Sequence, residues 1–298
     1  AEDPETKVIL LVSKPPHPEV LERIGVQVKA VKKPVVAVFL GADPNTISNY
    51  GMRSAQTLEE AALSAVAQSQ GKPHGEMQKA LSQRNEKLKT LAYDQSQQFK
   101  IGQKYIRGLF SGGTFCYEAQ LLFTDHLDEI HSNAPAGSSK KLDDPLRSVG
   151  HTVVDLGEDE FTVGRPHPMI DYSLRNKRII SEAKDPETAV ILLDVVLGYG
   201  SNMDPVAEIV PAIREAQAIA KENRRSLPVV CSVTGTDADP QNRAAVVSGL
   251  KACGALVMES NAAACLLAGQ MAVESKSCLD VMLKQSSHFT SEGSWPGR

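Results

Sequence analysis

The sequence predicts an α/β protein built from flavodoxin-like, doubly wound parallel sheets in three α/β/α layers, with one partial and one complete copy of the domain. Two observations support this prediction. Short strands alternate with helices along most of the chain, and the strands are apolar almost throughout, as in sheets that are covered on both faces. An internal repeat then relates the start of the chain to the second half of the larger domain.

The first unit, residues 1–70, contains few strands. Thr57 and Glu60 form a capping box, which predicts the start of a helix that reaches about residue 67. Its other predicted elements are a strand at 7–12, a helix at 19–31, a strand at 34–40 and a loop at 41–45. Because two parallel strands do not make a covered sheet, we expect this unit to be incomplete and the chain to be part of something longer.

The second unit, residues 104–274, follows a polar linker at 71–103 in which we expect a surface helix over 76–93. Its strands are predicted at 106–110, 151–155, 189–196, 228–233 and 255–258. Its helices are predicted at 114–127, 171–183, 204–223, 240–253 and 260–273. Residues 275–298 are a Ser-rich tail, which we expect to be mobile.

Residues 2–11 recur as residues 184–193, with Asp-Pro-Glu-Thr in both copies. A helix and then a Pro-Val-Val strand follow each copy, so the first unit matches the second half of the complete domain. We therefore expect the other half-copy upstream of Ala1. Two such domains commonly hold a ligand between them.

Composition excludes several classes of protein. The chain has 298 residues, of which 42% are hydrophobic and 23% charged, and its net charge of −4 gives no basic footprint for nucleic acid or an acidic membrane. No apolar run is long enough to span a bilayer. The five cysteines are widely spaced and form no Cys-x-x-Cys pair, which indicates neither a disulfide framework nor a zinc site. We expect a cytoplasmic protein without a metal.

An oxyanion site is predicted where the strand at 106–110 ends. The strand breaks at Ser111, Gly112 and Gly113, and a helix is predicted to begin with Thr114 as its N-cap. Glycines allow close approach of the backbone, and free amides at the positive end of a helix attract anions. These four residues are the predicted phosphate-binding residues. The alternative is that the two glycines only make a tight turn.

Other loops are expected at the same edge of the sheet, where ligands of open α/β sheets gather. The predicted substrate-binding residues in these loops are Asp155, Asp194, Gly198, Gly200, Ser201, Gly235 and Thr236. Asp194 lies in an apolar strand, and a carboxylate there is costly unless it is paired or functional. The alternative for Asp194 is a bond to the amides of a neighbouring loop.

Arg165 and His167 are the predicted catalytic residues. Prolines flank His167 and stiffen this loop; Arg165 could clamp a phosphate or carboxylate, and His167 could act as base or nucleophile. A structural hydrogen bond to a carboxylate is the alternative for His167. Cys116 is expected in the first turn of a helix, and we interpret it as a core residue rather than a reactive thiol.

The motif at 164–171, Gly-Arg-Pro-His-Pro-Met-Ile-Asp, with Val-Asp-Leu-Gly at 154–157 and Arg-Gly-Leu-Phe-Ser-Gly-Gly-Thr at 107–114, resembles the FdrA/YahF family. This family is a branch of the succinyl-CoA synthetase-like proteins, and the resemblance covers residues 3 to about 272. It implies that the first unit is like part of the α-subunit and that residues 104–274 are like the C-terminal ligase domain of the β-subunit. It also implies that the helix from Thr114 faces phosphate.

The sequence departs from true synthetases in two ways. Their phosphorylated histidine belongs in the loop at 41–51, which contains no His here, and neither an ATP-grasp domain nor a CoA-binding Rossmann domain is present in this chain. The resemblance therefore implies that CoA or a nucleotide enters only through missing domains or partners. The ligands expected of this chain are phosphate and an acyl or carbamoyl phosphate, and it is expected to form a homo-oligomer or to bind partner subunits.

Three functions stay open from the sequence. The first is an FdrA-like subunit of an acyl-CoA synthetase that binds phosphate or acyl phosphate at a helix N-terminus. The second is a subunit of an oxamate carbamoyltransferase, an activity that the resemblance implies for family members in purine and allantoin catabolism. The third is a non-catalytic assembly or ligand-sensing protein.

Overall fold

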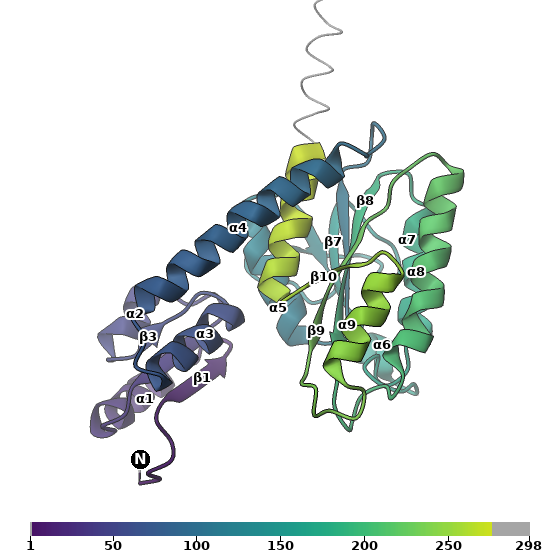
Figure 1. The fold of residues 1–298 in the computed structure, drawn as a ribbon. Coiled ribbons are helices and arrows are strands. Elements are labelled where there is room, and N and C mark those ends of the chain that lie inside the picture. Colours follow the sequence, from purple (N-terminus) through teal and green to yellow (C-terminus); the bar gives the residue numbers. More distant parts are fainter. Residues whose placement is uncertain (1, 276–298) are drawn as a thin grey trace, which may run out of the picture.

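The computed structural model describes residues 2–275, which form two parallel sheets (Figure 1). The first sheet has the strand order β1-β2-β3. The elements of this unit are β1 (Ile9–Ser13), α1 (Pro18–Ala30), β2 (Val35–Phe39), α2 (Pro44–Asn49), β3 (Arg53–Ser54) and α3 (Leu58–Ser69). β2 is buried along its whole length, because this strand of Val, Ala and Phe lies between two others with helices over it.

The prediction for this unit was correct for the longer elements and missed two short ones. β3 has two residues, too few for periodicity to reveal. α2 lies in the segment expected to begin as a loop, and the Asp43 carboxylate caps it by accepting two first-turn amides. The capping box is confirmed. Thr57 Oγ1 accepts from the amide of Glu60 at 3.0 Å, and the Glu60 carboxylate accepts from the amide of Gln56 at 2.9 Å.

A long helix, α4 (His74–Ser96), connects the two units, as predicted. In Figure 1 it runs from the first unit to the C-terminal helix of the second. Its sequence is polar, and only Leu88, Ala92 and Ser96 are buried, all in the half that lies against the second unit.

The second sheet is parallel throughout and has the order β10-β9-β8-β4-β7-β5-β6. Its strands are β4 (Tyr105–Phe110), β5 (Ile130–Ser132), β6 (Lys140–Lys141), β7 (His151–Asp155), β8 (Thr188–Val196), β9 (Val229–Thr234) and β10 (Leu256–Met258). The five predicted strands are all present, and their order is 2-1-3-4-5, the flavodoxin-like winding. β5 and β6 extend the sheet beyond β7 and were not predicted, because both are very short.

Helices cover both faces of this sheet and complete the three predicted layers (Figure 1). The helices of the second unit are α5 (Gly113–Thr124), α6 (Asp159–Thr162), α7 (Ser173–Lys184), α8 (Pro205–Glu222), α9 (Arg243–Ala252) and a helix at 261–275. One core packs α7, α8 and α9 on the sheet, and the other packs α5, the helix at 261–275 and the end of α4 on the opposite face.

α5 also joins the two units. Tyr117 and Leu121 on its outer side pack against Val36 and Val38 of β2. Glu118 is buried, and its Oε1 accepts the first amide of α3, from Leu58, at 2.8 Å. The same helix is therefore held by both sheets.

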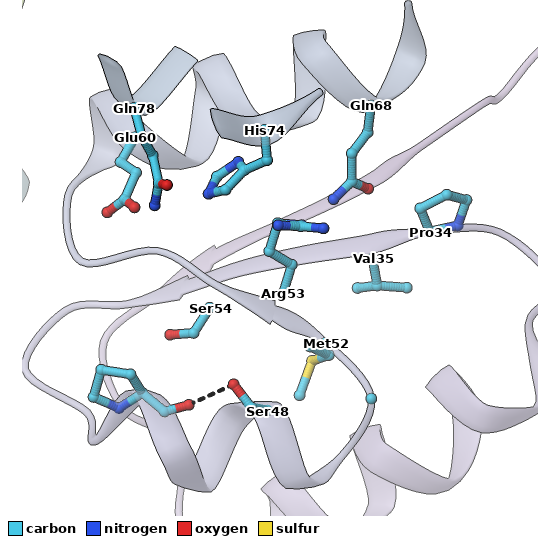
Figure 2. Close-up of a pocket in the computed structure, with 12 residues that line it drawn as sticks. Pro34, Val35, Ser48, Met52, Arg53, Ser54, Glu60, Gln68, His74 and Gln78 are labelled. Carbon is cyan, nitrogen blue, oxygen red and sulfur yellow. Dashed lines mark hydrogen bonds between the residues drawn. The ribbon is translucent and has the colours of Figure 1, made fainter. Parts of the chain in front are cut away.

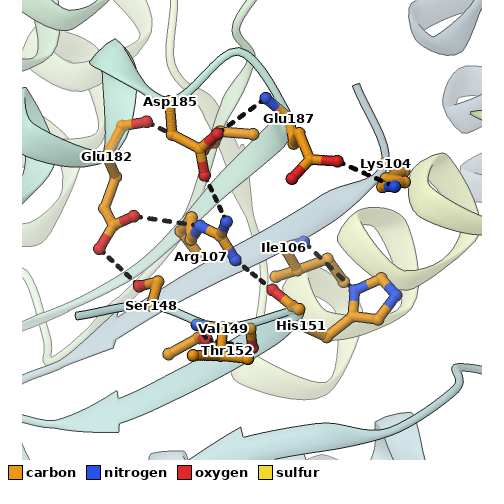
Figure 3. A network of polar contacts seen from close by, with 12 residues as sticks. Lys104, Ile106, Arg107, Ser148, Val149, His151, Thr152, Glu182, Asp185 and Glu187 are labelled. Carbon is orange, nitrogen blue, oxygen red and sulfur yellow. Dashed lines mark hydrogen bonds and ion pairs between the residues drawn. The ribbon is translucent and has the colours of Figure 1, made fainter. Parts of the chain in front are cut away.

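A network of polar side chains lies at the edge of the sheet where β4 begins (Figure 3). The guanidinium of buried Arg107 lies 3.0 Å from the Glu182 carboxylate and 2.5 Å from that of Asp185, and it also donates to the carbonyl of Gly150. It thereby ties β4 to the end of α7 and to the residue before β7.

Among residues 2–275, no helix has the length and apolar character needed to cross a bilayer. The predicted tail lies outside the described residues, apart from Ser275.

Candidate functional site

The turn after β4 is fixed by a carboxylate from the neighbouring strand. Asp194, near the end of β8 and 1% exposed, accepts the amide of Ser111 at 2.8 Å and its hydroxyl at 2.6 Å. Arg175 of α7 donates to the carbonyl of Asp194 at 2.7 Å and lies 3.2 Å from its carboxylate. Of the two interpretations of Asp194, the bond to a neighbouring loop is the one that the geometry shows.

The N-cap of α5 lies two residues before the predicted one. The helix starts at Gly113, and its N-cap is Gly112 in an extended conformation, with φ −168° and ψ 153°. Thr114 is an exposed residue of the first turn, so its prediction as N-cap was wrong. The reason is that Gly112 already breaks the strand, and the helical conformation follows it directly.

The first turn of α5 presents free donors. Within residues 2–275, no side chain caps this helix, and the amides of Gly113, Thr114 and Phe115 have no acceptor. A Cβ placed on Gly112 would meet no atom within 4 Å, so the space beside the cap is open. An open helix N-terminus with unpaired amides has the geometry of an anion site.

Two predicted residues from other loops meet this turn. A Cβ placed on Gly157 would lie 2.9 Å from His167 Nε2, 3.0 Å from Asp155 Oδ1 and 3.1 Å from the carbonyl oxygen of Ser111. Oδ2 of the same Asp155 would lie 2.9 Å from a Cβ on Gly113. His167, Asp155 and the Gly112-Gly113 turn therefore converge around residue 157, where only glycine fits.

The ring of His167 is oriented by its own loop. Its Nδ1 accepts the amide of Met169 at 3.2 Å, which leaves the neutral imidazole with its proton on Nε2. Nε2 is the atom that lies beside Gly157 and the turn. In this state His167 presents a hydrogen-bond donor to the site.

Asp155 holds its proton more tightly than an ordinary carboxyl group. Burial raises its pKa to about 6, the nearby charges of Glu158 and Asp194 add to that rise, and the bond from the Gly157 amide opposes it. A carboxylate facing a helix N-terminus competes with an external anion, whereas its protonated form does not. The ionised carboxyl group of Asp155 would therefore repel an anion at this turn, and the neutral form would not.

Sequence analysis missed the residue that holds Asp155. Asn133, just after β5, accepts the amide of Asp155 at 2.9 Å and donates to its carbonyl at 2.9 Å. Asn133 also donates to the Glu160 carboxylate at 2.7 Å. A single Asn after a short strand gives no sequence signal, because only the pairing of β5 with β7 brings Asp155 beside it.

Arg165 is not brought to the turn. It is exposed and lines a separate hollow of 300 Å³ with Phe161, Asp171 and Lys177. Leu156, the residue after Asp155, also lines this hollow, so the hollow and the α5 turn are neighbours at the end of β7. The predicted convergence of Arg165 with Gly112 and Gly113 is therefore not seen in the described structure.

The remaining predicted loops are shaped by internal hydrogen bonds. Gln241 bonds both the amide and the carbonyl of Gly198, at 3.1 and 2.7 Å. Thr236 donates through its amide and hydroxyl to Asp239, and Gly235, with φ +152°, leaves no room for a Cβ beside Leu197. Gly200 is exposed and Ser201 is buried.

A larger hollow of 750 Å³ lies in the first unit and contains none of the predicted residues. Figure 2 shows Arg53 rising from β3 toward His74 and Gln68, with Glu60 beside them. It is an open depression between β3, α3 and α4, and α2 contributes to it through Pro44 and Ser48.

Cys116 is a core residue, as interpreted from the sequence. It is fully buried in α5, and this burial raises the pKa of its thiol far above the ordinary value, which makes it unreactive. In the described range, no three His, Cys, Asp or Glu side chains are grouped to hold a metal ion.

Comparison with known proteins identifies the family. Residues 109–271, more than half of the chain, match the CoA-ligase family. The Escherichia coli (strain K12) protein YahF is 41% identical over 241 residues, which are 80% of this chain and 45% of YahF, so the chain spans about half the length of that relative.

Solved structures are also similar. Acetyl-coenzyme A synthetase 1 from Ca. Korarchaeum cryptofilum, solved with phosphate and ADP, is 13% identical, with a TM-score of 0.42 and coverage of 95% of this chain and 56% of that one. A protein from Pyrococcus horikoshii OT3 is 16% identical, with a TM-score of 0.34 and coverage of 93% and 54%. From the family match and the identity to YahF, the chain belongs to the CoA-ligase family of succinyl-CoA synthetase-like proteins.

Proposed function

We propose that this chain is the ligase part of an FdrA-like acyl-CoA synthetase assembly and that it binds phosphate or an acyl phosphate at the N-terminus of α5. The observation that supports this most is the set of unpaired amides at Gly113, Thr114 and Phe115 beside open space. Three amides at the positive end of a helix match the oxygens of a phosphoryl group.

The neighbouring side chains suit a group that carries negative charge. His167 offers Nε2–H to a phosphoryl oxygen, and below about pH 6 the protonated Asp155 carboxyl offers a second donor. Transfer of an acyl group from phosphate to a thiol releases phosphate dianion, and these donors would stabilise the charge that develops on it. In this proposal Arg165 and Lys177, in the adjoining hollow, attract the anion without touching the transferred group.

The partners and cofactors belong to the proposal as well. CoA and a nucleotide would be supplied by domains or subunits outside this chain. Residues 41–51 contain no histidine, so the residue that carries the phosphoryl group would also come from there. The chain spans less than half of YahF, so a whole-protein activity requires the rest of such a protein or its partner subunits.

Substitution of the N-cap tests the anion site. Gly112→Ser places a hydroxyl where it accepts the amides of Thr114 or Phe115, so the helix caps itself and gains a few tenths of a kcal/mol. We expect sulfate and phosphate binding, measured by calorimetry, to fall at least tenfold without loss of stability. Gly112→Ala is the matched control for the added Cβ, which the structure accommodates.

The proposal fails if Gly112→Ser binds sulfate as tightly as the parent chain. The reaction is tested on the full-length protein with CoA, phosphate and acetyl or succinyl phosphate as probes. Formation of acyl-CoA with release of phosphate supports the proposal. Phosphorolysis of oxalurate to carbamoyl phosphate, without acyl-CoA formation, would replace it with carbamoyl transfer.

A further inference from the structure

A third hollow lies at the opposite edge of the large sheet from the α5 turn. Its volume is 540 Å³, and it is enclosed by the ends of α4 and α8 and by the segments that lead into β9 and β10. The α5 turn follows the carboxyl end of β4, whereas this hollow precedes the first residues of two parallel strands. The two places are therefore separated by the length of the sheet.

The charged side chains that line this hollow are all cationic. Lys221 lies in the last turn of α8, Arg224 and Arg225 lie just beyond its end, and no Asp or Glu is among the described residues of the lining. The nearest carboxylate that acts on Arg225 is that of Asp185, which is already bound by Arg107 at 2.5 Å. A concave surface with one sign of charge concentrates ions of the opposite sign.

Arg225 carries a buried charge that the protein does not fully compensate. Its side chain is 6% exposed, and one terminal nitrogen, Nη2, donates to the carbonyl of Ala183. The other, Nη1, has no partner within residues 2–275, and burial lowers the pKa of the guanidinium. An unpaired buried cation is costly. Nη1 is itself buried, so an anion in the hollow that Arg225 lines would offset this cost through the field of its charge rather than by a bond to Nη1.

The cations are not needed to cap α8. Its final carbonyls already accept backbone amides, since Asn223, Arg224 and Arg225 donate to the carbonyls of residues 219–221. Within the described chain, the side chains of Lys221 and Arg224 have no ion-pair or hydrogen-bond partner. Arg224 also has φ +57°, a left-handed conformation in which Gly or Asn is favoured at a helix end. An arginine at this position therefore has a higher conformational energy than Gly or Asn would have.

Three amide side chains, Gln95, Gln98 and Gln217, complete the polar lining and offer both donors and acceptors. We propose that this hollow binds a small molecule that carries a diphosphate group, with Lys221, Arg224 and Arg225 opposite the phosphates and the glutamines beside the remainder. Three positive charges balance the charge of a diphosphate at neutral pH, and the volume of 540 Å³ leaves room for an attached polar group.

The test removes the two exposed charges and keeps the buried one. Lys221→Gln with Arg224→Asn eliminates both cations, and Asn suits the left-handed conformation, so we expect the fold to keep or gain stability. Pyrophosphate and ADP are titrated without metal by calorimetry in a Gly112→Ser background, in which the α5 turn caps itself. We expect the double variant to bind pyrophosphate about tenfold more weakly or worse.

The matched control is Arg214→Gln with Lys251→Gln, which removes two exposed cations outside the hollow and should leave affinity unchanged. Tighter binding of ADP than of pyrophosphate would show that the glutamines contact the nucleoside, and equal binding would show that the diphosphate alone is recognised. The proposal is overturned if neither probe binds or if the double variant binds like the control. Because the α5 turn is blocked throughout, this outcome does not depend on the function proposed for that turn.

Discussion

At the scale of single residues, the strongest prediction concerns how stability depends on pH through the carboxyl group of Asp155. Its pKa is raised to about 6, against about 4 in an unfolded chain, so the fold favours the protonated carboxyl. The stability that this group contributes is complete below about pH 4, is lost as the pH rises toward 6, and stays lost above it.

Asp155→Asn mimics the protonated form and can keep the bond to the Gly157 amide at 2.8 Å. Relative to this variant, wild type should therefore lose roughly 1–2 kcal/mol of unfolding free energy between pH 4.5 and 7.5, after allowance for solvent screening. Urea denaturation at several pH values measures the difference, with exposed Asp94→Asn as control. A difference that does not change with pH would contradict the buried, proton-binding role.

The residues of the site show what sequence can and cannot predict. Ser111, Gly112 and Gly113 could be found because a strand that breaks at glycines before a helix is a local pattern. His167 and Asp155 could be placed at the same edge by the rule for parallel sheets. Asn133 and Arg175 could not, because each acts on a residue about 20 positions away and only the folded chain brings them together.

At the scale of elements, Arg107 ties three pieces of the second sheet. Arg107→Lys keeps the charge but replaces a planar fork by a single ammonium group, which cannot reach Glu182, Asp185 and the Gly150 carbonyl together. We expect a loss of about 2–4 kcal/mol of unfolding free energy, because the buried Glu182 and half-buried Asp185 carboxylates are left with fewer partners.

Urea denaturation at neutral pH measures this loss. Arg147→Lys is the control, since Arg147 is 86% exposed and its pair with Asp144 spans 3.5 Å. A change in Arg107→Lys no larger than in the control would mean that the network adds nothing to stability.

The long elements were predictable and the short ones were not. β8 is an apolar run in a strand of nine residues, and α8 shows helical periodicity over eighteen residues. The predicted bounds of both agree with the structure to within one residue. β3 and β6 have two residues each, so their strand character comes only from pairing with a neighbour. The start of α5 was misplaced because glycine favours no single conformation, and either Gly112 or Thr114 could cap the helix by pattern alone.

At the scale of the whole molecule, Glu118 holds the two units together. One oxygen accepts the Leu58 amide at 2.8 Å, the other accepts Asn261 Nδ2 at 2.8 Å, and burial raises the pKa of the carboxyl group. Glu118→Gln has one acceptor in place of two, so its amide nitrogen must face one of these donors. We expect a cost of about 1–3 kcal/mol and weaker attachment of α3.

Hydrogen exchange measures that attachment. In Glu118→Gln, amides of residues 58–69 should exchange faster, while those of the central strand at 188–196 stay protected. Glu22→Gln, an exposed position of α1, serves as control. Unchanged exchange at 58–69 would show that the apolar contacts of Tyr117 and Leu121 are sufficient by themselves.

The anchoring of Ser111 by Asp194 has a consequence for how fast the turn would capture the anion that we propose it binds. Because the amide and hydroxyl of Ser111 both donate to a buried carboxylate, the shape of the turn is set during folding and does not have to be assembled around each incoming molecule. An encounter then needs no induced rearrangement and loses little loop entropy, so its rate is governed by diffusion and by the surrounding charges.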